Sequence, residues 1–342
     1  MKVKLGDIFE IGSGGTPSKS HPEYYGGDIP WVKTGDLKNE YLYEVEDFIT
    51  EEGLKNSSAK MYEADTVLIA MYGATIGATS MLKINACTNQ ACAAFKKNEQ
   101  IIPEYLYYFL RSQKEKFVKD GVGGAQPNIS VGYLKKVEME LPSLEEQREI
   151  VDILDKTSDI VVKRNREINL LDDLIKARFV EMFGDPIINS KNKDTQDLKD
   201  VLVLKAGDFT AASDISEEPT ETNIYPCYGG NGIRGYVADY NQEGEYSLVG
   251  RQGALSGNVQ YAEGKFRNTE HALLVTPIIE MNSIWLNQLL VNLDLKRYQT
   301  GAAQPGLSVK NLQEIPIIMV SIDEQNRYAD FVHQVDKSKF DS

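Results

Sequence analysis

The clearest alternation of apolar and polar positions lies in the middle of the chain, from Glu145 to Phe183, a stretch without Gly or Pro. Ser143 followed by Glu146 is typical of a helix N-terminus, and Gly184-Asp185-Pro186 ends the pattern. Ten positions from 150 to 182 alternate at spacings of four and three, as in the seam of a coiled coil. Seven of the ten are apolar: Ile150, Leu154, Val161, Ile168, Leu171, Ile175 and Met182. The pattern predicts one helix of about 59 Å that needs a partner helix along its seam.

An internal repeat divides the rest of the chain. Gly124–Val131 recurs as Ala302–Val309, and the same offset also maps Glu146-Gln147 onto Glu324-Gln325. Upstream, Met71–Gly77 aligns with Arg251–Gly257 at nearly the same offset, as a short loop insertion would produce. A period close to half the length of the chain is far outside the range of solenoid repeats, so we interpret it as two related domains.

Both copies show short strand-like segments separated by Gly, and one helical segment each. The strands are expected within 65–70, 77–82, 245–249 and 272–276, and the helices at 103–110 and 282–290. A second long-helix pattern begins near Ile322 and is about half as long as the first. The fold class expected is α+β, with two tandem domains separated by a coiled-coil-type helix and followed by a second, shortened helix. The predicted boundaries are 1–143, 144–184, 185–320 and 321–342.

Composition places the chain among globular proteins, with 342 residues, 42% hydrophobic residues and a formal net charge of −14. Its three cysteines, Cys87, Cys92 and Cys227, form no CxxC pair. A disulfide framework and a four-thiolate metal site are therefore not expected, and reduced cysteines fit the cytoplasm. The longest uncharged run, Thr66 to Leu82, is shorter than a membrane-spanning helix requires, so no membrane contact is expected.

Signatures of catalysis are missing from the sequence. There is no GxxxxGK[ST] phosphate loop, no HExxH and no GxSxG. The histidines, His21, His271 and His333, have no Cys or carboxylate at metal-ligand spacing. An adenine methyltransferase would need an Asn-Pro-Pro-aromatic tetrad, which is also missing. We expect no catalytic residue, no metal and no cofactor in this chain.

With catalytic motifs absent, the notable feature of the sequence is a set of polar loops flanked by Gly, which occur in both repeats. Lys, Arg, Gln, Asn and Thr are the side chains that hydrogen-bond base edges in the major groove of DNA. Ordinary solvated loops would have the same composition, and that alternative stays open at this point. Local charge favours nucleic acid slightly, because Arg111 to Lys136 holds six basic residues against Glu115 and Asp120 within an acidic protein.

Taken together, these segments resemble the specificity subunit of type I restriction–modification systems. The resemblance covers essentially the whole chain and rests on an ordered set of motifs. The set comprises Leu5–Ile8, Gly14–Ser18, Ile29–Val32, Met71–Gly77, Ala125–Ser130, Leu141–Gln147, Tyr228–Tyr236 and Gly250–Ala254. Members of this family have a second spacer helix about as long as the first, and here it ends at Ser342.

The resemblance implies two target-recognition domains, each reading one half of a bipartite double-stranded DNA site. The long helices hold these domains apart and dock methyltransferase subunits, and endonuclease–translocase subunits join that core. The subunit itself is non-catalytic. Its partners use S-adenosylmethionine for adenine methylation, and ATP and Mg²⁺ for translocation and cleavage.

Candidate binding residues follow from the polar loops and the helix seam. The DNA-binding candidates are Thr16, Lys33, Thr34, Asp36, Tyr72, Thr75, Gln126, Asn128, Asn231, Arg234, Arg251, Gln252, Asn268, His271 and Gln304. The candidates for binding a partner helix are Ile150, Leu154, Val161, Ile168, Leu171 and Ile175. Because the second helix covers only half of the seam, we expect Ile168, Leu171 or Ile175 to meet another subunit, in a complex or in self-association, or to stay exposed.

Two other classes of protein share some of these features. A stand-alone sequence-specific DNA-binding protein would have the polar loops, but would not need a rigid spacer of this length. A non-catalytic coiled-coil scaffold would explain the helix, but not the duplicated Gly-rich loops.

Overall fold

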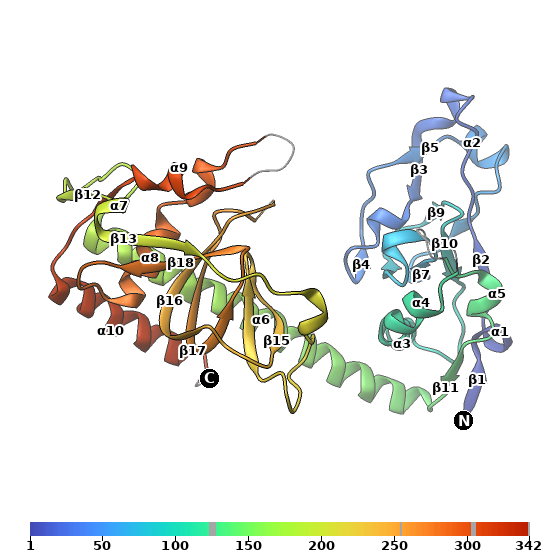
Figure 1. Ribbon diagram of the computed structural model, residues 1–342. Coiled ribbons are helices and arrows are strands. Elements are labelled where there is room, and N and C mark those ends of the chain that lie inside the picture. Colours follow the sequence, from blue (N-terminus) through green and yellow to red (C-terminus); the bar gives the residue numbers. More distant parts are fainter. Residues whose placement is uncertain (123–127, 254, 302–305, 341–342) are drawn as a thin grey trace. The chain divides into compact units, whose positions relative to one another are not determined.

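The computed structural model describes residues 1–122, 128–253, 255–301 and 306–340 (Figure 1). The chain folds into two compact units, Met1–Val162 and Lys163–Ser342. The boundary between them falls inside the long helix α6 (Leu144–Phe183), so each unit contains part of that helix. The α+β class, the long helix and the short C-terminal helix expected from the sequence are confirmed.

Unit 1 is built on a five-stranded sheet in the order β2-β10-β7-β8-β4 and a four-stranded sheet in the order β5-β3-β9-β6. A short ladder of β1 and β11 lies beside its N-terminus. The strands are β1 (Lys2–Lys4), β2 (Ile11–Ser13), β3 (Tyr25–Val32), β4 (Tyr41–Leu42), β5 (Phe48–Ile49), β6 (Met61–Tyr62), β7 (Val67–Ala70), β8 (Thr79–Leu82), β9 (Ala86–Thr88), β10 (Cys92–Phe95) and β11 (Glu138–Glu140). The helices are α1 (Leu5–Ile8), α2 (Glu51–Lys55), α3 (Pro103–Ser112), α4 (Lys114–Asp120) and α5 (Val131–Leu134), with 3₁₀ turns at Pro22–Tyr24, Thr34–Asp36 and Gly73–Thr75.

The core of unit 1 lies between the five-stranded sheet and α3. Strand β7 reads Val-Leu-Ile-Ala and is buried at every position, since both of its faces are covered. Leu106 and Leu110 of α3 are also fully buried and belong to the same cluster as Ile69. Pro103 occupies the first turn of α3, where its missing N–H costs nothing.

Unit 2 has a six-stranded sheet in the order β13-β18-β16-β17-β14-β15 and a short β12-β19 ladder. Its strands are β12 (Thr195–Asp197), β13 (Leu202–Ala206), β14 (Tyr225–Gly229), β15 (Gly232–Val237), β16 (Gln242–Gly250), β17 (Val259–Asn268), β18 (Ala272–Pro277) and β19 (Pro316–Ile318). Its shorter helices are α7 (Leu198–Val201), α8 (Ser283–Asn292) and α9 (Val309–Gln313), with 3₁₀ turns at Ala212–Asp214 and Leu295–Tyr298. The strands and helices predicted in both repeats are confirmed within a few residues.

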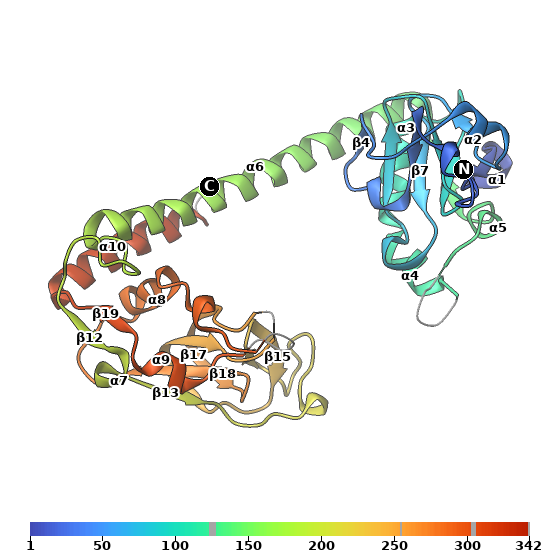
Figure 2. The same ribbon diagram turned by 90° about the horizontal axis from the view of Figure 1, so that it is seen from above.

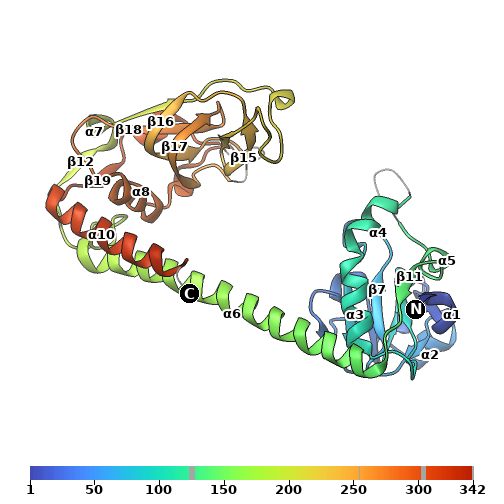
Figure 3. The same ribbon diagram turned by 90° about the horizontal axis from the view of Figure 1, so that it is seen from below.

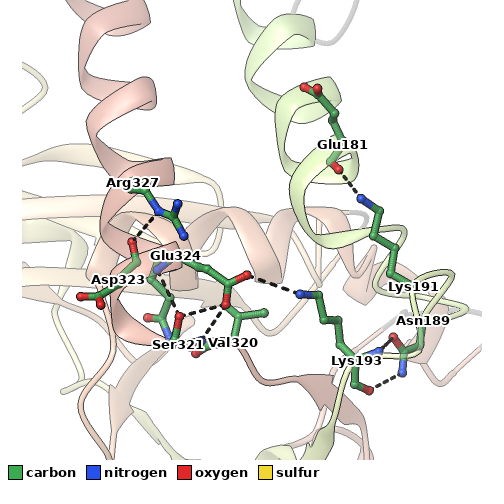
Figure 4. A network of polar contacts seen from close by, with 10 residues as sticks. Glu181, Asn189, Lys191, Lys193, Val320, Ser321, Asp323, Glu324 and Arg327 are labelled. Atoms are coloured by element: carbon green, nitrogen blue, oxygen red, sulfur yellow. Dashed lines mark hydrogen bonds and ion pairs between the residues drawn. The ribbon is translucent and has the colours of Figure 1, made fainter.

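Helix α6 begins as the sequence predicts, at a capping box. The Glu146 Oε2 atom accepts hydrogen bonds from the Ser143 N–H at 2.8 Å and the Ser143 hydroxyl at 2.9 Å. Helix α10 (Ile322–Ser338) begins with the same arrangement of Ser321 and Glu324. Figure 4 shows this second cap, with Lys193 reaching Glu324 at 3.5 Å. Because α10 starts beside the loop that follows α6, it runs back along the second half of α6.

The pairing of α10 with α6 is antiparallel, as Figures 2 and 3 show. Near the start of α10, the Tyr328 hydroxyl donates to the Ile175 carbonyl at 3.0 Å. Near its end, Lys339 Nζ lies 2.7 Å from an Asp172 carboxylate oxygen. Tyr328 also packs edge-on against Phe179 and Phe183 of α6. The contact therefore combines aromatic packing and a hydrogen bond at Tyr328 with an ion pair at Lys339.

The expectation that Ile168, Leu171 or Ile175 stays uncovered is wrong. Ile175 is 4% exposed and Leu171 packs against the core of unit 2, because α10 covers this half of the helix. Ile168 is half-buried. Along the seam, the uncovered part lies in the first half, where Val161 is 53% exposed.

A repeated glutamine ties each of these two helices to its own unit. The Gln147 side chain is fully buried, accepts from the Ile102 N–H at 2.9 Å, and donates to the carbonyls of Gln100 and Pro142. Gln325 accepts from the Asn282 N–H at 2.9 Å and donates to the Val320 carbonyl at 3.0 Å. Ile102 and Asn282 are the N-caps of α3 and α8. The repeated glutamine thus joins α6 to α3 in unit 1 and α10 to α8 in unit 2.

Candidate nucleic-acid interface

Each unit contains a junction of three loops held by the same backbone hydrogen bonds. In unit 1, the Met71 N–H donates to the Ala91 carbonyl at 2.8 Å, and the Ile129 N–H donates to the Met71 carbonyl at 2.9 Å. In unit 2, the Arg251 N–H donates to the His271 carbonyl at 3.0 Å, and the Leu307 N–H donates to the Arg251 carbonyl at 2.8 Å. The repeat found in the sequence therefore reproduces one scaffold in both units.

The tips of these junctions project into open space. Gly73 and Gly253 have φ values of +66° and +78°, and a Cβ placed on either would meet no atom of the described residues within 4 Å. These left-handed conformations favour glycine. The residue before each glycine is exposed, and its backbone bridges to a third loop: Tyr72 pairs with Asn128, and Gln252 with Gly306. Tyr72 and Gln252 are therefore accessible from solvent at the ends of β7 and β16.

Around the tip of unit 2, four side chains form a polar chain. The Gln252 amide oxygen lies 3.1 Å from His271 Nδ1, and His271 Nε2 lies 3.1 Å from a Glu270 carboxylate oxygen. The Arg251 guanidinium donates to the Glu270 backbone carbonyl at 3.2 Å. The second Glu270 carboxylate oxygen and Arg251 Nε are buried and have no hydrogen-bond partner among the described residues. Arg251 is thus half-buried beneath the tip, and Gln252 is the outermost of the four.

The predicted loop after Trp31 is engaged within unit 1. The Lys33 N–H donates to an Asp36 carboxylate oxygen at 2.7 Å, and the Lys33 ammonium pairs with Asp47. That hydrogen bond with Asp47 raises the pKa of Lys33. Thr34 and Asp36 form a 3₁₀ turn, and both are half-buried. The charge of Lys33 is thus already paired within unit 1.

The other candidates differ in how far they reach solvent. Asn128, Asn231 and Arg234 are exposed, and the Asn231 side-chain oxygen accepts from Asn258 Nδ2 at 3.0 Å. The Thr75 hydroxyl donates to the Tyr72 carbonyl at 3.0 Å. Gln126 and Gln304 lie outside the described residues.

Two candidates are less accessible. Asn268 is 1% exposed at the end of β17, and its backbone N–H donates to the Asn241 side chain at 2.7 Å. Its side chain is therefore buried and does not face solvent. The Thr16 hydroxyl donates to the Gln90 side chain. Gln90 was not among the candidates, although the alignment that pairs Met71 with Arg251 also pairs Gln90 with Glu270 and could have singled it out.

An apolar groove of about 740 Å³ lies between α3 and the exposed first half of α6, within unit 1. Tyr108 closes one side by donating its hydroxyl to an Asp155 carboxylate oxygen at 2.6 Å. The groove includes three of the predicted partner-binding residues, and it is lined by Tyr105, Tyr108, Phe109, Arg111, Ser112, Ile150, Leu154, Thr157, Ser158, Val161 and Val162.

The corresponding surface of unit 2 is filled. The offset that maps Gln147 onto Gln325 also maps Ile150, Leu154 and Thr157 onto Tyr328, Val332 and Val335 of α10. All three residues of α10 are buried in the core that Ile175 and Phe179 of α6 also enter. The groove of unit 1 is therefore open, whereas the corresponding surface of α10 in unit 2 is covered by the second half of α6.

The structure gives no sign of a metal centre or a membrane segment in the described ranges. No group of three or more His, Cys, Asp or Glu residues in those ranges is placed to hold a metal ion. No helix among them is long and apolar enough to cross a membrane. All three cysteines are buried as free thiols.

The chain thus contains two α+β units, each with the same loop junction, and a long helix that belongs to both units. Residues 1–170 and 190–342 match the family model described as type I restriction modification DNA specificity domain. The chain belongs to this family of DNA specificity subunits.

Curated relatives and solved structures agree with the family model. The chain is 31% identical over 339 residues to the type I restriction enzyme EcoprrI specificity subunit of Escherichia coli, covering 94% of this chain and 84% of that one. It is 34% identical over 187 residues to the MjaIX specificity subunit of Methanocaldococcus jannaschii, covering 53% of this chain and 43% of that one.

Among solved structures, the type I system S subunit from M. genitalium has a similar fold. It matches with a TM-score of 0.56 and 19% identity, over 99% of this chain and 90% of that one. A structure from work on complex assembly and conformational transition of the type I restriction–modification system matches with a TM-score of 0.57 and 16% identity, over the same shares.

Proposed function

We propose that each unit reads one half of a bipartite double-stranded DNA site. In this proposal, residues 1–143 and 185–320 are the two recognition domains, and 144–184 and 321–342 are the spacer helices. One observation carries the proposal: the loop junction has the same backbone hydrogen bonds in both units, but its outer side chains differ. Tyr72, Gln90 and Ala91 in unit 1 correspond to Gln252, Glu270 and His271 in unit 2. A shared scaffold with different tips suits two related domains that read different base sequences.

The helix α6 would set the distance between the two half-sites. A continuous helix of 40 residues without Gly or Pro is stiff and about 60 Å long. Bipartite recognition needs such a fixed separation, because half-site spacing must match the geometry of the protein.

A methyltransferase subunit would dock through a helix laid in the groove between α3 and α6. In support, six apolar residues on the first half of α6 are at least one third exposed: Leu144, Ile150, Ile153, Ile160, Val161 and Val162. Exposed apolar surfaces of this kind normally mark protein interfaces. The filled surface of unit 2 supports a helix as the occupant, since α6 there packs Ile175 and Phe179 into the core that α10 shares.

The chemistry of the assembled complex would come from its partners. The methyltransferase subunit would use S-adenosylmethionine, and an endonuclease–translocase subunit would use ATP and Mg²⁺. This chain would select the DNA sequence and position both activities on it. The buried free thiols suit a complex that works in the reducing cytoplasm.

Mapping of methylated adenines tests the DNA-binding proposal. The chain is expressed with its methyltransferase in a strain that lacks other adenine methylation, and every modified site is sequenced. We expect one motif made of two fixed half-sites separated by a gap of constant length. A single uninterrupted motif would contradict the proposal. Absence of methylation together with salt-sensitive, sequence-specific retardation of DNA would favour a stand-alone DNA-binding protein.

Co-purification tests the docking surface. The double variant Val161→Asp, Val162→Asp places charges on two exposed residues of the groove without disturbing the core, and should lose the methyltransferase. Ile188→Asp, at an equally apolar residue that is 72% exposed outside the seam, is the matched control and should retain it. Retention by both variants would refute docking at this groove.

A further inference from the structure

The tip of the unit 2 junction holds its outermost side chain in place before any DNA arrives. Gln252 is exposed, and its backbone bridges to Gly306. Its neighbour Arg251 is fixed on both sides by backbone hydrogen bonds to His271 and Leu307. The position of the Gln252 Cα atom is therefore determined by three loops at once, which leaves only its side chain free to move.

The side chain of Gln252 is restrained as well. Its amide oxygen lies 3.1 Å from His271 Nδ1, and the other ring nitrogen lies 3.1 Å from the Glu270 carboxylate. His271 and Glu270 side chains are 41% and 29% exposed, so the chain of contacts runs from a half-buried acid outward to the tip. Glu270 is anchored in turn, because its backbone carbonyl accepts from the Arg251 guanidinium.

This arrangement changes what Gln252 can offer to DNA. A free Gln pairs with adenine through both ends of its amide. Here the imidazole occupies the amide oxygen, which leaves the amide nitrogen as the group available to a base edge. Fixing a flexible side chain in advance also removes part of the entropic cost of ordering it on binding.

Unit 1 lacks this restraint although it has the same scaffold. Tyr72 stands at the position of Gln252, Ala91 at that of His271, and Gln90 at that of Glu270. Ala91 has no polar side chain, and Tyr72 is 44% exposed. The difference lies at the side chains that face outward, while the backbone hydrogen bonds beneath them are kept.

We propose that Gln252 is a specificity-determining residue that contacts one base pair of the half-site read by unit 2, and that His271, held by Glu270, is its positioning residue. This inference rests on the proposed function, since it assumes that unit 2 reads DNA. It goes further by naming one reading residue and assigning His271 a role that does not require contact with DNA.

The test compares methylation of an oligonucleotide panel by the complete complex. The panel carries the wild-type target and every single base-pair substitution in both halves. Gln252→Ala should relax discrimination at one base pair of the unit 2 half by about 2- to 10-fold, the range for a single hydrogen bond to a base edge. His271→Ala should relax the same base pair by a smaller factor, and the double variant should behave like Gln252→Ala alone.

Two further variants separate positioning from a general effect on structure. His271→Gln keeps a polar group of similar reach and should restore part of the discrimination. His21→Ala removes the other histidine–glutamate pair, His21 with Glu23 at 2.8 Å in unit 1, and should leave the unit 2 half unchanged.

Failure of this inference and failure of the proposed function give different results. An unchanged base preference in His271→Ala, relaxation at a different base pair, or an equal loss on all sequences would overturn the inference and leave bipartite recognition standing. A wild-type complex that shows no bipartite target would overturn the proposed function, and the inference with it.

Discussion

Replacing Gln147 with Ala should strongly destabilise unit 1 and leave unit 2 unaffected. The Gln147 side chain is fully buried and makes three hydrogen bonds, with the Ile102 N–H and the carbonyls of Gln100 and Pro142. Each such bond contributes about 0.5–1.5 kcal/mol, and a buried partner left unsatisfied adds to the loss. The expected decrease in the free energy of unfolding is about 3–5 kcal/mol, a large share of the 5–15 kcal/mol typical of a domain.

The two tryptophans make the assay specific for each unit. Trp31 lies in unit 1 and Trp285 in unit 2, and both are buried. Urea unfolding is followed by fluorescence in backgrounds where the other tryptophan is replaced by Phe. Gln147→Ala should lower the midpoint reported by Trp31 only. Gln325→Ala, which removes two bonds to Asn282 and Val320, is the matched control and should lower the midpoint reported by Trp285 only.

A loss below about 1 kcal/mol in Gln147→Ala would refute the reasoning, because three buried hydrogen bonds cannot be removed at so small a cost. A shift of both transitions would show that the junction does not act within one unit.

Three other perturbations have defined outcomes. Tyr328→Phe removes the bond to the Ile175 carbonyl and should cost unit 2 about 1 kcal/mol in thermal or urea unfolding, whereas no change would mean that the bond is replaced by water. The Lys83 ammonium lowers the pKa of Asp65, so this pair should stabilise unit 1 above about pH 4 and lose that effect as the pH falls further; Asp65→Asn should flatten the acid side of the stability profile, and an unchanged profile would contradict this. Seven residues inserted after Val162 keep the heptad register and lengthen α6 by about 10 Å, close to three base-pair steps. The methylated motif should gain about three base pairs in its gap, and an unchanged gap would show that α6 is not the spacer.

Much of the fold could be predicted because its signals are local. The spacing of apolar residues, the Ser143–Glu146 cap and the glycine at 184 define α6 within one residue of its observed start. The repeat predicted two units, and the glutamine of its Glu-Gln pair is buried and hydrogen-bonded to a helix N-cap in both.

The covered half of α6 could not be predicted, because it depends on the path of the whole second unit. Strand β19 brings the chain to Ser321, beside Lys193 in the loop that follows α6. Helix α10 therefore covers Ile175 and leaves Val161 exposed, the reverse of the expectation.

The candidate interface was predicted in outline only. Gly-flanked loops indicated the junctions, and exposed Tyr72 and Gln252 are where the pattern placed them. Composition could not separate side chains that face outward from those already paired, such as Lys33 with Asp47. It also could not show that Asn268 ends a strand and is buried.

Exchange of one recognition domain tests the central claim most directly. Residues 1–143, which end at the cap of α6, are replaced by the corresponding domain of a relative with a different target, and methylated adenines are mapped across the genome. We predict that one half of the motif changes to that of the relative, while the other half and the gap length stay the same. A change in both halves, or in neither, would contradict the claim that the two units read separate halves of one DNA site.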